Sequence, residues 1–277
     1  MDNNDNNGKL DGSWLAMEES RRVWWAILIM DRFLSLGNPS RRLSTADPQF
    51  NFYLPVDDKA FLDGGATPQL AVTISAGFNL NMGSFARLAQ ATFLSSQAIQ
   101  HLSQPEAPSQ INGIARTADN TAQLRRTLAA QVHAAEEEQE IRRLPTCCQA
   151  MFSYCAVLLL QEHEWQAVGI TSTEQAYQYM FEETTRALDF FGRAVAAVII
   201  ELQNGGCLEC YPLFFIQTLY QAAGVTMDLA QGNHDPILEE NLSIFRSALQ
   251  HFQPRWQLAD VFLNILDTKE TIIMASA

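Results

Sequence analysis

The chain has 277 residues, of which 47% are hydrophobic and 18% are charged. This composition is typical of a packed globular protein and excludes an intrinsically disordered one. The net charge of −13 argues against direct contact with DNA, because nucleic-acid binding requires basic patches that displace counterions from the phosphates.

The cysteines and the apolar runs restrict the cellular setting. The cysteines are odd in number and unevenly spaced, which does not indicate a disulfide framework, so we expect a reducing intracellular compartment. No apolar run reaches the roughly 20 residues that a membrane-spanning helix requires. We therefore expect no membrane segment.

The first predicted helix follows a polar start. Residues 1–12 are rich in Asn and Asp and predict a disordered leader, and Ser13 is expected to cap a helix over 14–36. That helix carries apolar residues on two sides, and its second side is an unbroken apolar stripe of Val23, Ile27, Met30 and Leu34. A helix of this kind is expected to be buried between neighbours. Residues 37–40, which include a Gly and a Pro, end it.

Residues 38–70 predict one long loop. Four prolines and a Gly-Gly pair interrupt any helix in this stretch, whereas aromatic residues such as Phe50, Phe52 and Tyr53 indicate that the loop packs against helices. An ordered loop after the first helix is therefore expected.

Apolar periodicity of 3.6 residues predicts the remaining helices. They are expected over residues 80 or 84 to 101, 120–144, 145–163, 177–202, 213–231, 237–252 and 256–266, with a linker over 103–119. Because no convincing strand or internal repeat is present, the expected fold is all-α. It is an irregular multi-helix bundle, with a single domain over residues 13–277.

Motifs that would indicate catalysis or metal binding are weak. Cys207 and Cys210 form a CxxC, which would be half of a zinc site or a redox pair, but no second CxxC accompanies it. The five histidines are isolated, and no nucleophile, phosphate-loop or dinucleotide motif occurs. We expect no enzyme, no cofactor and no metal in this chain. An unrecognised enzyme with a buried helical pocket stays as an alternative.

One stretch resembles a known family. Residues 18–39 contain paired Arg, paired Trp, an aliphatic run, Asp-Arg and a Gly-x-Pro stop, and residues 54–58 read Leu-Pro-Val-Asp-Asp. This pattern resembles the fungal-specific transcription factor domain, the middle homology region of zinc binuclear cluster transcription factors. Residues 85–101, 219–223 and 255–259 are similar to it more weakly. The family-motif residues are Arg21, Arg22, Trp24, Trp25, Asp31, Arg32, Pro55, Asp57 and Asp58.

The resemblance implies a nuclear regulatory region of a fungal transcription factor, corresponding to the C-terminal part of that domain. The family's two zinc ions are bound by an N-terminal cluster of six cysteines, so no zinc is expected in this chain. The implied partners are other regions of the parent factor or a full-length relative, and a small-molecule effector between helices. The alternative is a truncated paralogue that acts as a helical interaction module.

The resemblance also implies a domain that is incomplete on its N-terminal side, because the family has helices before the motif. A helix without those neighbours would expose apolar surface, so we expect low solubility or self-association. The motif itself is expected to be structural. Trp24 and Trp25 supply packing area, and Asp31 or Arg32 should find a partner inside the fold, because buried polar groups require one.

Overall fold

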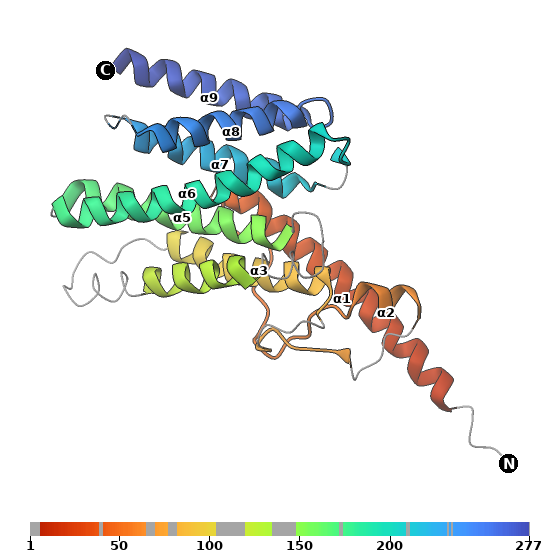
Figure 1. The fold of residues 1–277 in the computed structure, drawn as a ribbon. Coiled ribbons are helices and arrows are strands. Elements are labelled where there is room, and N and C mark those ends of the chain that lie inside the picture. Colours follow the sequence, from red (N-terminus) through yellow and green to blue (C-terminus); the bar gives the residue numbers. More distant parts are fainter. Residues whose placement is uncertain are drawn as a thin grey trace. The chain divides into compact units, whose positions relative to one another are not determined.

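The computed structural model describes the backbone of residues 6–38, 41–64, 70–76, 82–103, 120–134, 148–171, 174–208, 211–231, 233 and 235–276 (Figure 1). Side chains are described over the same ranges except at 6–13, 148–149, 165–174, 176 and 276. The all-α prediction is confirmed. Within the described residues, the β structure is limited to an isolated antiparallel bridge between Tyr53 and Thr73.

The chain forms two compact units, Met1–Ser153 and Tyr154–Ala277, where the sequence had suggested one domain over 13–277. Among the described residues, no helix is both long enough and apolar enough to cross a bilayer.

The first unit is built on a long helix and the loop that follows it. Helix α1 (Asn6–Leu36) packs on α3 (Ser84–Ser103), and the short α2 (Asp58–Leu62) follows the loop (Figure 1). Residues 120–134 are also helical, and α5 (Cys148–Thr171) begins at the end of this unit. The side chain of Asp57 caps α2 by accepting hydrogen bonds from the amides of Lys59 and Ala60.

The start of α1 differs from the prediction. Residues 6–12 belong to the helix, so the expected disordered leader is wrong over this stretch, while residues 1–5 lie outside the described chain. Ser13 is therefore inside the helix and does not cap it. The physical reason is that, once a helix has formed, each further residue that joins it gains one backbone hydrogen bond. This gain offsets the modest helix propensity of residues 6–12.

The described part of the long loop after α1, residues 41–57, is ordered, as predicted, and leads into α2. Its backbone pairs with a second loop segment: Leu54 N donates to Val72 O at 2.8 Å, and Ile74 N donates to Phe52 O at 3.0 Å. This pairing brings both loop segments into the core of the unit. The buried core residues are Trp25, Leu28, Leu54, Ile74, Met82, Ala86, Ala89 and Phe93.

The second unit consists of the rest of α5 and four further helices: α6 (Glu174–Gln203), α7 (Leu213–Ala230), α8 (Pro236–Phe252) and α9 (Gln257–Ser276). Helix α8 packs against α6, α7 and α9 (Figure 1). Its start follows the expected capping chemistry, because Asp235 accepts a hydrogen bond from Ile237 N and Pro236 occupies the first helical position. Helix α9 ends ten residues later than predicted.

Aromatic side chains fill the interior of this unit. Phe191 of α6 stacks on Phe245 of α8 with ring centroids 5.4 Å apart. Tyr211, Phe215 and Phe252 form a second cluster, with centroid separations of 5.4 to 5.7 Å. Such pairs add attraction beyond the apolar area that they bury. The helices are thus held by specific ring packing.

Candidate functional site

The family-motif residues lie together in the first unit, on α1 and the loop that covers one of its sides. Near the N-terminal end of the motif, Arg22 joins the helix to the loop. Its guanidinium donates to Asp58 Oδ1 at 2.8 Å, to Val56 O at 2.7 Å and to Glu18 Oε1 at 3.2 Å. Glu18, in turn, accepts from Val56 N at 2.9 Å and from Arg21. Ion pairs and hydrogen bonds at this end of the motif therefore connect α1 to the loop and to α2.

The two tryptophans anchor the same side of α1. Trp25 is fully buried, and its indole Nε1 donates to Tyr53 O at 3.0 Å. Trp24 is half-buried and lies edge-on to Trp25, with ring centroids 5.2 Å apart. Pro55, between the buried Leu54 and Val56, is buried as well. The two tryptophans and Pro55 thus contribute to packing.

Asp31 and Arg32 form a second polar cluster at the other end of the motif. Both were expected to need an internal partner, and they pair with each other at 2.6 Å while the side chain of Arg32 is fully buried. Arg32 also donates to Thr45 Oγ1, Thr45 O, Ser96 Oγ and Asp47 Oδ1, each at 2.7 Å. One guanidinium therefore connects α1, the loop and α3.

Charges in this second cluster balance. The two carboxylates of Asp31 and Asp47 face the two guanidinium groups of Arg32 and Arg41. Burial alone would raise the pKa of Asp31. Hydrogen bonds from Arg41, from the backbone and hydroxyl of Thr45 and from the backbone of Ser44 outweigh it, and they hold the pKa far below its ordinary value. Asp31 is therefore a structural anion.

Sequence reasoning missed several members of these clusters. Asp47 accepts from Ser96 Oγ at 2.6 Å and from two glutamines of α3, although nothing near it in the sequence indicates this role. Arg41 and Glu18 were also missed as motif partners. For Glu18 a signal existed, since Arg21 and Arg22 follow it at the helical spacings of three and four.

The opposite side of α1 contradicts the prediction of burial. We call the exposed apolar residues there the α1 stripe. Of the four predicted stripe residues, Val23 is 60% exposed, Ile27 54%, Met30 49% and Leu34 52%. Ala26 is exposed between them and completes the stripe. The physical reason is that α3 and the loop pack on the tryptophan side, so the second apolar side of α1 faces outward.

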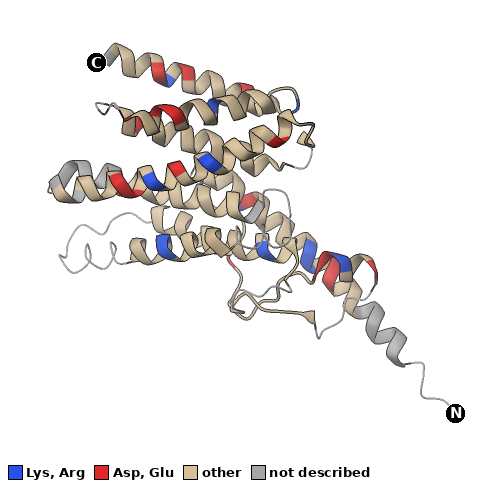
Figure 2. Cartoon of the chain, in the orientation of Figure 1, with Lys and Arg blue, Asp and Glu red and all other residues tan. Residues whose placement is uncertain are grey.

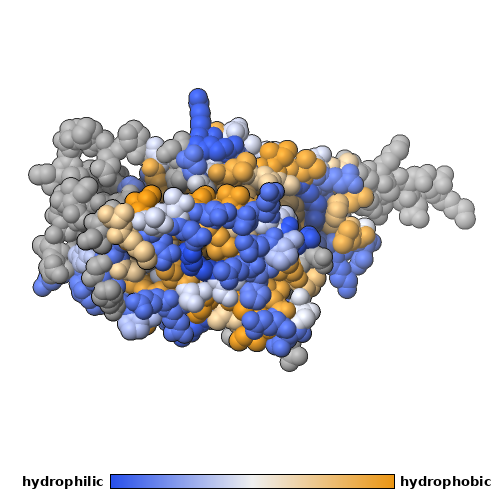
Figure 3. Space-filling model, turned by 90° about the horizontal axis from the view of Figure 1, so that it is seen from above, coloured by the Kyte–Doolittle hydropathy of each residue, from blue (hydrophilic) through white to orange (hydrophobic). Residues whose placement is uncertain are grey.

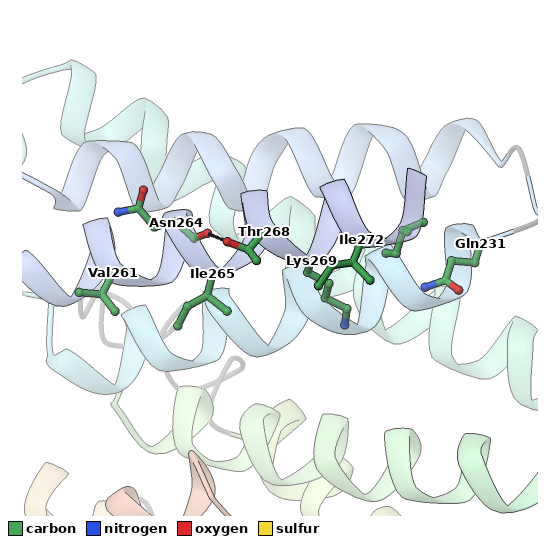
Figure 4. A pocket seen from close by; sticks show the side chains of 8 residues that line it. Gln231, Val261, Asn264, Ile265, Thr268, Lys269 and Ile272 are labelled. Carbon is green, nitrogen blue, oxygen red and sulfur yellow. Dashed lines mark hydrogen bonds between the residues drawn. The ribbon is translucent and has the colours of Figure 1, made fainter. Parts of the chain in front are cut away.

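The second unit carries an open groove between the end of α7 and α9, with a volume of about 720 Å³ (Figure 4). Val261, Ile265 and Ile272 of α9 line it, with Lys269 beside them and Gln231 at the end of α7. Seen from above, apolar residues interrupt the polar surface on the face that includes α9 (Figure 3).

Charged and metal-binding side chains are dispersed over the described chain. Lys and Arg are spread over several of the described helices, most of which also carry Asp or Glu (Figure 2). Within the described ranges, no group of His, Cys, Asp and Glu is placed to hold a metal ion. Cys207 is exposed, whereas its CxxC partner at position 210 lies outside the described residues.

Comparisons with known proteins identify no relative: no family model matches the chain, and no curated protein or solved structure is significantly similar to it.

Proposed function

We propose that this chain is a nuclear regulatory region of a fungal transcription factor, without a DNA-binding module of its own, and that it acts by pairing through the α1 stripe. The observation that supports the proposal is the exposed apolar stripe on α1. Ion pairs of the family-motif residues hold the other side of α1 against the loop and α2. The motif resemblance supports the transcriptional role. The balanced ion pairs fix α1 against the loop, so the stripe lies on a rigidly held helix.

The occupant we assign to the stripe is the same helix of a second copy. The stripe residues recur at spacings of three and four, which places them on one side of α1. Their order is self-complementary: in an antiparallel pair, Val23 lies opposite Leu34 and Ile27 lies opposite Met30. A two-fold interface requires this reciprocity, since the same patch must serve both copies.

Charge and size define how strong this pairing is. No charged side chain lies within the stripe between Val23 and Leu34, so the net charge of −13 does not place like charges in the centre of the pair. The rise of the helix from Val23 to Leu34 is about 17 Å, which makes a short interface. We therefore expect a concentration-dependent dimer of micromolar or weaker affinity, because a short apolar seam barely exceeds the entropy cost of association.

The same surface serves the alternative function. A truncated paralogue would use its stripe to pair with the matching helix of a full-length relative, and would then regulate that relative by forming mixed pairs. Both versions of the proposal depend on α1. They differ in the partner that is recovered from cells.

A reporter assay tests the proposal. Fused to an unrelated DNA-binding domain in a fungal host, the chain should change transcription of a reporter, and Ile27→Asp should abolish the change. The control is Ile200→Asp, because Ile200 is an equally exposed isoleucine (58%) outside the stripe. A reporter that does not respond to the chain, or that responds equally to both variants, would contradict the proposed role.

A further inference from the structure

A second cavity, of about 300 Å³, lies wholly within the second unit, between α5, α6 and the end of α7. Gln161 and Glu162 of α5, Thr184 of α6 and Asp228 of α7 supply its polar lining. Val225 and Leu229 supply apolar walls, and Gln231 completes the rim. The volume and the mixed lining are those of a site for a small molecule.

Two buried polar groups in this lining have no partner. Among the described residues, no hydrogen bond reaches Gln161 Oε1 or Thr184 Oγ1, although the residues are only 3% and 1% exposed. An orphaned buried polar atom is costly, and such atoms usually mark a missing ligand or water. The amide oxygen of Gln161 accepts hydrogen bonds, so its missing partner is a donor.

The charge of the cavity is negative. Glu162 Oε2 accepts a hydrogen bond from Gln221 Nε2 at 2.7 Å, and Asp228 Oδ2 pairs with Lys269 Nζ at 2.8 Å. Lys269 also donates to Gly224 O at 3.1 Å, which holds it at the α7 side. Among the described residues, the ammonium group of Lys269 pairs with Asp228, and no ion pair compensates the charge of Glu162 when that acid is ionised.

The environment of Glu162 raises the pKa of its carboxyl group. Burial raises the pKa of Glu162, and the nearby Asp228 raises it further, while Lys269 and Gln221 lower it in part. The same carboxylate contributes, after burial itself, to raising the pKa of the Cys155 thiol to about 12. A second cation at this carboxylate would remove that electrostatic cost.

We propose that this cavity binds a small organic cation, a primary amine or guanidine on a short aliphatic chain. The cationic head donates to Glu162, Gln161 and Thr184, and the aliphatic chain lies against Val225 and Leu229. This assignment is independent of the proposed function, because every residue that carries it belongs to the second unit and none belongs to the α1 stripe.

The test is calorimetric titration of the full chain at neutral pH with n-butylamine and n-butylguanidine, alongside 1-butanol and butyrate as neutral and anionic probes of the same size. We expect saturable binding of the two cations alone. Glu162→Gln should weaken it about tenfold or more, since a hydrogen bond to a charged group is lost. Glu239→Gln, at an exposed acid on α8, is the matched control and should leave the affinity unchanged.

A second variant keeps the test decisive. Thr184→Val removes an orphaned hydroxyl at constant shape, so it should raise the midpoint of thermal unfolding without ligand and weaken cation binding. The inference is overturned if neither cation binds saturably, if 1-butanol or butyrate binds as well as the amine, or if Glu162→Gln binds unchanged. Ile27→Asp should bind the amine like the unmodified chain, which separates this inference from the pairing proposal.

Discussion

The guanidinium of Arg32 donates to the carboxylate of Asp47, 2.7 Å away and fifteen residues further along the chain. Arg32 is fully buried on α1, and Asp47 lies in the loop, where it also accepts hydrogen bonds from α3. This ion pair therefore connects the loop to two helices. Together with the contacts of Arg22, Trp25 and Arg41, it accounts for the order of a stretch with so little regular structure.

Replacing Arg32 should destabilise the first unit strongly. In Arg32→Met the carboxylates of Asp31 and Asp47 lose their shared buried partner, and breaking a buried pair from one side costs about 3–5 kcal/mol. Hydrogen exchange measured on peptides of α1 reports this loss separately from the second unit. The control is Arg193→Met, because the side chain of Arg193 is 70% exposed and its loss should change little. Equal exchange in the two variants would contradict the role of Arg32.

The stability that Asp31 confers should depend on pH. Its folded pKa lies far below the ordinary value of 3.8, so its contribution is complete above that value and is lost as the pH falls through it towards the folded pKa. The difference in unfolding free energy between the unmodified chain and Asp31→Asn should be largest near neutrality and shrink below about pH 4. Denaturant titrations at several pH values measure it. A gap that stays constant over this range would show that Asp31 is not held as an anion.

Gly192 permits the close approach of α6 and α8. A Cβ atom at this position would clash with the side-chain oxygen of the buried Asn241. Gly192→Ala should therefore lower the stability of the second unit by about 1–3 kcal/mol, the usual cost of overpacking. Combining it with Asn241→Ala should restore part of the loss, because the clashing side chain is then removed. A Gly192→Ala variant as stable as the unmodified chain would contradict this packing.

The sequence predicts the helices better than it predicts their surroundings. Periodicity located α3, α6, α7 and α8 closely. It misjudged α1, since two apolar sides on one helix do not reveal which side finds a neighbour. The partnership of Arg32 with Asp47 depends on the path of a loop, and the orphaned side chains of Gln161 and Thr184 depend on how three helices meet. Neither the ion pair nor the missing hydrogen bonds produce a local pattern in the sequence.

Sedimentation of the full chain over about a hundredfold range of concentration tests pairing through the α1 stripe most directly. We expect a reversible monomer–dimer equilibrium for the unmodified chain, because its stripe is self-complementary. Ile27→Asp should be monomeric throughout, since two buried charges would then face the seam of the pair, whereas Ile200→Asp should associate like the unmodified chain. A monomer at every concentration, or an Ile27→Asp variant that still forms the dimer, would contradict the account.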